Sequence, residues 1–145
     1  LQVGDSLRLG ALSGAALHYE PDWQEKPLWL LGAGTGLAPL WAVLREALRQ
    51  GHQGPIRVVH VASAGAEHYL AGALLALAER HAHVQVELIE GPQLPAFLST
   101  LRLASRQTVA LLCGGPEIVE VVSRRLYLAG LPRSQLLSDL FLPHA

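Results

Sequence analysis

The stretch that decides the fold is Gly32-Ala33-Gly34-Thr35-Gly36-Leu37-Ala38-Pro39, which separates two segments of different apolar pattern. Residues 28–31 before it are a short apolar run, typical of a strand buried on both faces. After it, leucines recur at helical spacing from Leu37 to Leu48, and Gly51 supplies a stop. Glycines in such a turn let a ligand approach the backbone amides, and the helix start adds a partial positive charge. The stretch therefore predicts strand, turn and helix, with chemistry that suits a pyrophosphate.

The stretch does not match the two best-known phosphate-binding motifs, and a turn without a ligand has the same spacing. It is not the ordinary dinucleotide fingerprint, because Leu37 stands where that pattern has its third glycine, and no Lys-Ser/Thr pair follows as in a Walker loop. A glycine-rich turn that only packs closely against a sheet has the same spacing. From the spacing alone, both the ligand-binding and the packing interpretation stay open.

Strand and helix patterns alternate along the rest of the chain. Short connections between them predict βαβ units, a parallel sheet with helices on both faces, and a ligand site at the carboxyl ends of the strands. The fold class is therefore three-layer, doubly wound α/β. The expected strands cover residues 28–31, 56–62, 84–89, 108–113 and 135–141, and the expected helices cover 37–48, 67–80, 95–104 and 116–129.

A second glycine-rich stretch, Cys113-Gly114-Gly115-Pro116-Glu117, follows the fourth expected strand. Pro116 and Glu117 suit the first turn of a helix. We expect Cys113 to face the same crevice as Thr35, since both follow strands of one parallel sheet. Taken alone, a cysteine at a strand end is also an ordinary small packing residue, and this alternative stays open.

Composition narrows the classes of protein. The chain has 145 residues, of which 50% are hydrophobic and 16% charged, so it suits one folded domain rather than a disordered segment. Its net charge of −1, without a basic tail, argues against nucleic acid or an anionic membrane as a partner. One cysteine excludes an internal disulfide and suits a reducing cytoplasm. No methionine begins the chain, so we expect a fragment whose missing part lies upstream.

Membrane and metal classes are disfavoured as well. The longest uncharged stretch, residues 27–44, holds three glycines and Pro39 in its middle, which break a membrane-spanning helix. The pair His81 and His83 invites a metal interpretation but has no third ligand nearby, and the other five histidines are scattered without ligand spacing, so no metal site is assigned.

The two glycine-rich stretches together resemble a known family. Residues 34–40, Gly-Thr-Gly-Leu-Ala-Pro-Leu, and residues 113–119, Cys-Gly-Gly-Pro-Glu-Ile-Val, resemble paired elements of the ferredoxin–NADP reductase superfamily, with Ile118 at the usual methionine. Residues 138–141, Ser-Asp-Leu-Phe, are similar to the family's acidic-x-Phe ending. Residues 3–14 resemble the exit from its flavin-binding barrel. The resemblance spans essentially the whole chain.

The resemblance implies a five-stranded parallel NAD(P)H-binding domain over residues 28–145, and a remnant of a β-barrel flavin domain plus linker over 1–27. Gly34, Thr35 and Gly36 would cradle the pyrophosphate, and Cys113 and Gly114 would border the nicotinamide. The candidate catalytic residues are Thr35 and Cys113. The candidate coenzyme-binding residues are Gly32, Gly34, Thr35, Gly36, Ala38, Pro39, Ser63, Cys113, Gly114, Gly115, Pro116, Glu117 and Phe141.

The implied activity is that of an NAD(P)H-dependent flavin oxidoreductase. Hydride would pass to FAD, or FMN, on the missing flavin domain of the same polypeptide, and electrons onward to an iron–sulfur protein, a haem or an oxygenase. We expect the domain alone to be inactive. Family members that select NADP carry a basic residue after the second strand, whereas residues 63–66 here are Ser-Ala-Gly-Ala, so NADH is favoured over NADPH. Ser63 is suited to a ribose hydroxyl and equally to capping the next helix.

Two alternatives remain. One is a non-catalytic, degenerate dinucleotide fold that acts as a sensor or docking module. The other is a flavodoxin-like enzyme that binds FMN in the same loops, which is disfavoured because such phosphate loops are rich in Ser and Thr and only Thr35 qualifies here.

Overall fold

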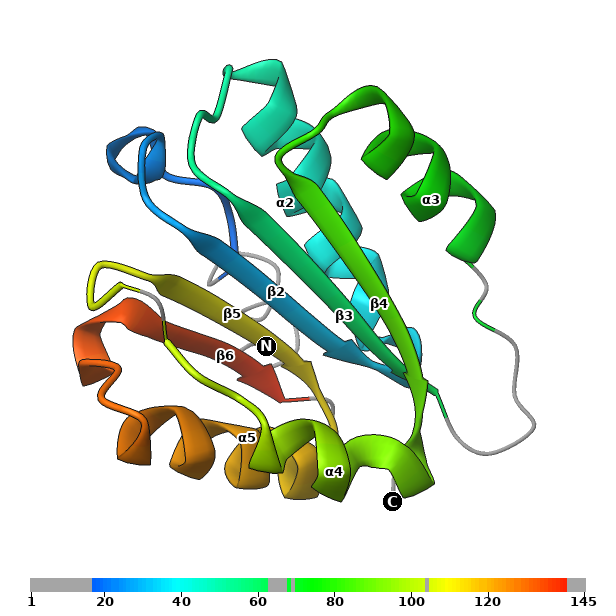
Figure 1. Ribbon diagram of the computed structural model, residues 1–145, viewed down its shortest axis with the longest axis vertical. Coiled ribbons are helices and arrows are strands. Elements are labelled where there is room, and N and C mark those ends of the chain that lie inside the picture. The colour runs from blue at the N-terminus through cyan, green and yellow to red at the C-terminus, as the bar shows by residue number, and fades with distance from the viewer. Residues whose placement is uncertain (1–16, 63–67, 69, 104, 141–145) are drawn as a thin grey trace, which may run out of the picture.

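The computed structural model describes residues 17–62, 68, 70–103 and 105–140. Within them, five strands form one parallel sheet in the order β4-β3-β2-β5-β6 (Figure 1). This confirms the predicted doubly wound α/β class. The strands are β2 (Leu28–Ala33), β3 (Ile56–Ala62), β4 (Val84–Glu90), β5 (Val109–Gly114) and β6 (Leu136–Leu140).

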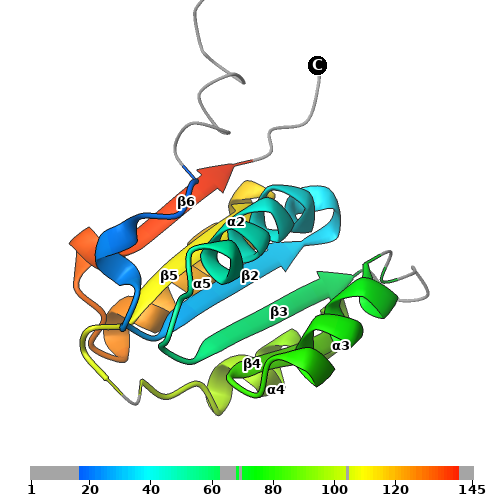
Figure 2. The same cartoon turned by 90° about the horizontal axis from the view of Figure 1, so that it is seen from above.

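Helices cover both faces of the sheet, as Figures 1 and 2 show. One face carries α2 (Leu37–Arg49) and α3 (Ala71–Arg80), and the other carries α4 (Leu94–Ser99) and α5 (Pro116–Leu128). Short 3-10 turns are η1 (Pro21–Trp23), η2 (Gly34–Gly36), η3 (Gly91–Gln93) and η4 (Arg133–Gln135).

The core lies in two layers, one on each side of the sheet. Along β2, Leu28 and Leu30 pack towards α2 and α3, whereas Trp29 and Leu31 pack towards α4 and α5. All four are buried, the least so being Trp29 at 8% exposed. A central strand covered on both faces needs apolar residues at successive positions, which explains the unbroken run in the sequence.

Two helices differ from their predicted extents. The helix predicted over 67–80 is described as α3 from Ala71 onward, with residues 67 and 69 outside the described part. The helix predicted over 95–104 ends at Ser99. There the hydroxyls of Ser99 and Thr100 donate to the carbonyls of Ala96 and Phe97, at 2.8 and 2.9 Å. Such side-chain bonds to nearby backbone compete with helix continuation.

The segment from residue 17 to 27, interpreted from sequence as linker, packs onto the domain. Leu17 and Tyr19 are 4% and 5% exposed and belong to the core beneath α2. The Tyr19 hydroxyl lies 2.9 Å from Nδ1 of His52, and its ring meets Trp23 edge-on at 5.8 Å. Residues 3–14, which resemble the exit from a flavin-binding barrel, lie outside the described residues, so the domain division at residue 27 stays a prediction.

Candidate functional site

The two glycine-rich stretches follow neighbouring strands. From β2 the chain continues sideways to β3 and β4, whereas β5 and β6 lie on the other side of β2. The sheet order therefore reverses between β2 and β5, and open parallel sheets bind ligands outside the carboxyl ends of their strands at such a point. The register pairs Gly32 with Cys113, so the two turns begin side by side.

The turns are in main-chain contact, and this contact requires glycine. A Cβ atom on Gly36 would lie 2.7 Å from the carbonyl carbon of Cys113 and 3.0 Å from the Gly114 nitrogen. A Cβ atom on Gly114 would lie 2.9 Å from that of Ala33. These separations leave no room for a methyl group, because the atoms opposite are mostly backbone. Close packing therefore accounts for glycine at 36 and 114.

Gly34 is glycine for a different reason. Its φ is +58°, the left-handed region that costs an ordinary residue about 1 kcal/mol or more, and a Cβ there would meet nothing within 4 Å. Gly34 and Thr35 are exposed, whereas Gly36 is buried. The turn thus presents Thr35 outward while Gly36 anchors it to β5.

Two helices begin at this edge of the sheet. The helix α2 starts at Leu37 directly after η2, and α5 starts at Pro116 with Gly115 as its N-cap. Their N-cap residues, Gly36 and Gly115, have no side chain that could accept from the first-turn amides. Each helix start therefore offers N–H groups and a partial positive charge, which favour an anion by roughly 0.3–1 kcal/mol. The arrangement suits a diphosphate.

The remaining predicted residues occupy this edge as follows. Gly32 is buried near the end of β2, and Ala38 and Pro39 lie in the first turn of α2, with Ala38 exposed. Pro116 and Glu117 are exposed in the first turn of α5. The structure thus brings the predicted residues of both stretches together. Ser63 and Phe141 lie outside the described residues.

Cys113 lies at the second turn with its side chain packed into the core beneath that turn. The residue is 1% exposed, and its side chain belongs to the apolar core on the α2 side. On the other side of the sheet, a hollow between Cys113 and Ile118 has a volume of about 10 Å³, which is about the size of one water. An aromatic ring does not fit there, so a bound nicotinamide would lie outside the two turns.

His60 is the part of this site that the sequence analysis missed. It is 1% exposed in β3, opposite Gly32 in the register. Its Nε2 lies 2.9 Å from the carbonyl oxygen of Gly34, and its Nδ1 lies 2.9 Å from Nδ1 of His68. Burial lowers the pKa of His60 below the usual value, the Gly34 carbonyl raises it in part, and His68 lowers it further. A histidine between valines in a buried strand was the available signal, whereas the histidines had been considered only as metal ligands.

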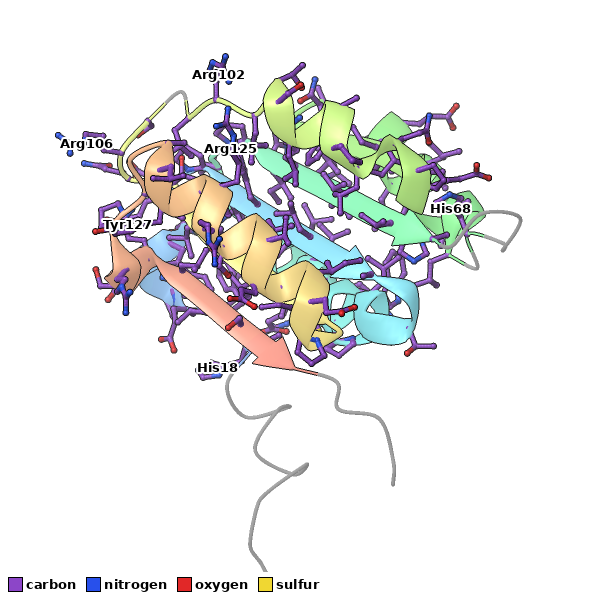
Figure 3. The ribbon with its side chains drawn as sticks, turned by 90° about the horizontal axis from the view of Figure 1, so that it is seen from below. His18, His68, Arg102, Arg106, Arg125 and Tyr127 are labelled. Carbon is purple, nitrogen blue, oxygen red and sulfur yellow. The ribbon has the colours of Figure 1, made fainter. Side chains whose placement is uncertain are left out.

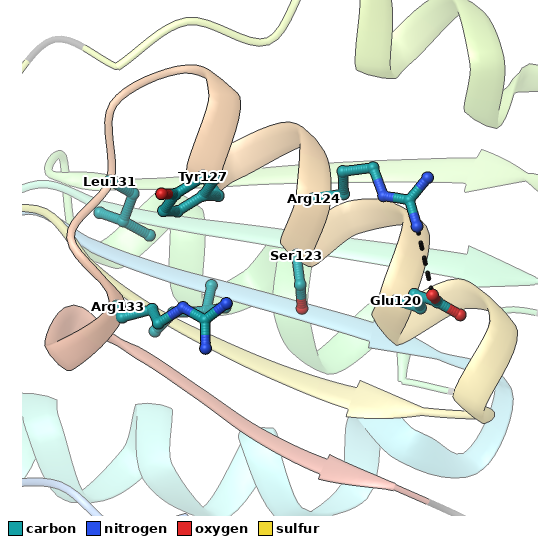
Figure 4. Close-up of a pocket in the computed structure, with 7 residues that line it drawn as sticks. Glu120, Ser123, Arg124, Tyr127, Leu131 and Arg133 are labelled. Carbon is teal, nitrogen blue, oxygen red and sulfur yellow. Dashed lines mark hydrogen bonds and ion pairs between the residues drawn. The ribbon is translucent and has the colours of Figure 1, made fainter.

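A larger groove lies elsewhere on the domain. It has a volume of about 540 Å³ and runs along α5 and the start of β6 (Figure 4). Arg124 pairs there with Glu120 at 3.3 Å, and the Arg133 guanidinium lies 5.8 Å from the ring centre of Tyr127. Figure 3 shows Tyr127 at the end of the molecule opposite His68. This groove is therefore separate from the two turns.

The described part of the chain has neither a cluster suited to a metal ion nor a helix suited to a membrane. No three His, Cys, Asp or Glu side chains gather there as a metal site would require. Among the same residues, no helix combines the length and the apolar character needed to cross a bilayer.

Comparison with known proteins agrees with this geometry. The family model described as oxidoreductase NAD-binding domain matches residues 30–124. A Ralstonia reductase component of naphthalene 1,2-dioxygenase/salicylate 5-hydroxylase systems is 31% identical over 99% of this chain and 46% of its own length. A flavohemoprotein of Chromobacterium violaceum is 36% identical over 61% of this chain and 21% of its own length. The chain spans less than half the length of these relatives.

Solved structures show the same fold. An Amycolatopsis cytochrome P450 reductase superposes with a TM-score of 0.72 at 24% identity, over 86% of this chain and 40% of that one. The FAD/NAD-binding part of a Vibrio cholerae nitric oxide dioxygenase superposes with a TM-score of 0.69 at 23% identity. The match covers 82% of this chain and 52% of that one. Because the family model covers well over half of the residues, including the first turn and the second, this chain belongs to the oxidoreductase NAD-binding domain family of ferredoxin–NADP reductase-like proteins.

Proposed function

We propose that this chain binds NADH across the two turns and presents its nicotinamide to a flavin carried by another domain. The observation that carries the proposal is the main-chain contact between Gly36 and Cys113, which joins two helix starts at the point where the sheet order reverses. A diphosphate at the start of α2 and a ring beside the start of α5 would each meet a suitable surface.

Each candidate residue then has a defined role. The exposed turn of Gly34 and Thr35 faces the pyrophosphate, with Ala38 and Pro39 of α2 bordering it. The main chain of Cys113 and Gly114, with Gly115, Pro116 and Glu117, forms the floor beneath the nicotinamide. Thr35 and Cys113 act on hydride transfer by setting the position of the ring. Gly32 leaves space for the turn, Ser63 bonds a ribose hydroxyl, and Phe141 lies near the flavin or nicotinamide face.

Hydride transfer itself is the chemistry of the nicotinamide and the flavin, FAD or FMN, when both are bound. This chain binds and orients the coenzyme and excludes water from it. Onward transfer to an iron–sulfur protein, a haem or an oxygenase is supported by relatives that are named as reductase components of dioxygenase systems and as flavohemoproteins. The presence of a single cysteine, Cys113, suits a cytoplasmic setting.

NADH is proposed over NADPH because a 2′-phosphate beyond β3 would need a basic partner. Residues 63–66 supply no Lys or Arg. A dianionic group without a charge partner loses the charge-assisted bonds that would offset its desolvation.

Titration of the 145-residue chain with NADH tests the proposal. We expect the amide signals of Gly34–Gly36 and Gly114–Gly115 to shift together, with a smaller response to NADPH. Unfolding temperature should rise with NADH concentration, since a ligand that binds only the folded state stabilises it. No shift of these amides at millimolar NADH would overturn the proposal and favour the non-catalytic alternative.

A further inference from the structure

A chain of polar contacts links β3 to the first glycine turn. His60 Nε2 lies 2.9 Å from the carbonyl oxygen of Gly34, and His60 Nδ1 lies 2.9 Å from His68 Nδ1. The two imidazoles meet edge-on, with ring centres 4.8 Å apart. Figure 3 places His68 at the edge of the molecule where β3 ends. The contacts therefore join the buried interior of the sheet to the exposed turn.

The partners fix the protonation pattern of both rings. A carbonyl oxygen only accepts, so His60 must donate from Nε2. Burial of His60, at 1% exposed, disfavours its charged form, and a neutral imidazole that donates from Nε2 accepts at Nδ1. His68 must then donate from its own Nδ1. The pair thus holds His60 in the one tautomer that can bond to Gly34.

That bond sets the direction of a peptide group in the turn. The described residues contain no cis peptide bond, so the carbonyl of Gly34 and the N–H of Thr35 lie in one peptide plane and point in opposite directions within it. Because the carbonyl points at His60, the Thr35 amide is directed away from β3. Gly34 has no side chain to restrict its backbone, and it adopts a φ of +58°. The orientation of the Gly34–Thr35 peptide is therefore weakly restrained by its own residues, and a hydrogen bond from another element is needed to fix it.

We propose that His60 is a positioning residue for coenzyme binding, which holds the Gly34–Thr35 peptide in its binding orientation while His68 fixes the His60 tautomer. The proposal rests on the proposed function, because it concerns the same turn. His60 contacts the turn and not the coenzyme, so it acts through Gly34.

The test compares His60→Phe with His52→Phe in the 145-residue chain. Both histidines are buried, at 1% and 3% exposed, and each bonds through its ring, but His52 lies in the loop before β3, at the other end of the strand. We expect His60→Phe to shift the amide signals of Gly34–Gly36 without ligand and to weaken NADH about tenfold, or about 1.4 kcal/mol. His52→Phe should change neither. Unaltered turn signals and NADH affinity in His60→Phe would overturn the proposal.

A conservative variant separates positioning from packing. His60→Gln keeps a donor towards Gly34, so we expect it to recover part of the NADH affinity and of the turn signals lost in His60→Phe. His68→Phe removes the partner of Nδ1 and should shift the same turn signals in the same direction, by a smaller amount. Equal losses in His60→Gln and His60→Phe would contradict the role of the bond.

A measurement on the unaltered chain needs no variant and no coenzyme. Nitrogen-15 signals of the imidazole should show His60 protonated at Nε2 and His68 at Nδ1. The opposite tautomer of His60 would overturn the proposal even if NADH binds. If the unaltered chain fails to bind NADH, the proposed function fails, whereas the ligand-free turn signals of His60→Phe still decide whether His60 positions the turn.

Discussion

The main chains of Gly36 and Cys113 touch across the carboxyl ends of β2 and β5, so closely that a Cβ atom on Gly36 would overlap the Cys113 carbonyl group. Gly36 directly precedes α2, and Cys113 lies one residue before the end of β5. Their contact brings the starts of α2 and α5 to one place. The geometry of the site therefore depends on a backbone approach that only the absence of a side chain permits.

Gly36→Ala should destabilise the chain by about 1–3 kcal/mol, the usual cost of overpacking, and abolish NADH binding. The atoms opposite are backbone and cannot rotate aside. The matched control is Gly72→Ala in α3, where a Cβ meets nothing within 4 Å and helix propensity predicts a gain of about 0.5–1 kcal/mol. Denaturant unfolding measures both. A neutral Gly36→Ala would show that the turn relaxes freely.

Thr35→Val and Cys113→Ala should slow hydride transfer more than they weaken flavin retention, when measured in a longer protein that carries the flavin domain. Thr35 is exposed in the turn, and the Cys113 side chain packs beneath the main chain that we propose as the floor of the nicotinamide site. A smaller side chain at position 113 would let that main chain shift, so both substitutions should change the position of the nicotinamide. Stopped-flow flavin reduction by NADH gives the rate, and flavin release on dilution gives retention. Equal losses of both would assign the two residues a structural role.

Stability should fall as the pH is lowered from 7.5 to 5.5. Burial is the main cause that lowers the pKa of His52 and of His60, so the unfolded chain takes up protons near pH 6.5 while the folded chain does not. Stability is complete above that pH and is lost below it, by up to about 1.4 kcal/mol per pH unit for each histidine. Glu46, whose pKa is lowered to about 2 chiefly by its bond from Arg49, titrates below this window.

Urea unfolding at several pH values measures this dependence. The variant His52→Phe should show a shallower slope between pH 7.5 and 5.5, because one of the two buried histidines no longer titrates. A slope equal to that of the unaltered chain would mean that His52 is protonated equally in the folded and unfolded states.

Arg57→Lys should cost about 1 kcal/mol of stability. The Arg57 guanidinium binds the Glu87 carboxylate through two nitrogens and lies 5.0 and 5.2 Å from the ring centres of Trp29 and Phe97. A lysine keeps the charge but cannot bond the carboxylate through two nitrogens or stack a planar group on the two rings. The control Arg124→Lys, in an ion pair whose side chains are both 71% exposed, should change stability by less than about 0.5 kcal/mol. Thermal or urea unfolding measures the stability of both variants. Equal losses in Arg57→Lys and Arg124→Lys would contradict a stabilising role for the contacts of Arg57 with Trp29 and Phe97.

The sheet could be predicted because its central strands are covered on both faces, which explains the apolar run at 28–31 and the valine-rich stretch at 56–62. Helix α4 was predicted too long because its end depends on hydroxyl bonds from Ser99 and Thr100, and helix-forming residues continue beyond them. Helical spacing describes which face is buried and says little about where capping bonds end an element.

Much of the candidate site could be predicted for a similar reason. Glycines at 34, 36 and 114 are visible in the sequence, and each is explained by a local φ or a close approach. His60 was missed because its role depends on β3 lying beside β2, which pairs it with Gly32 across strands. The sequence separation between Gly34 and His60 does not indicate that the two residues are in contact.

The pairing of Gly32 with Cys113 joins segments from nearly opposite ends of the domain. During synthesis, β2, β3 and β4 are complete well before β5 emerges, and until then half of the proposed coenzyme surface is missing. Closing so long a loop is a slow, entropically costly step. A growing or truncated chain that stops before Val109 would therefore lack NADH affinity, which makes coenzyme binding a reporter of completed folding.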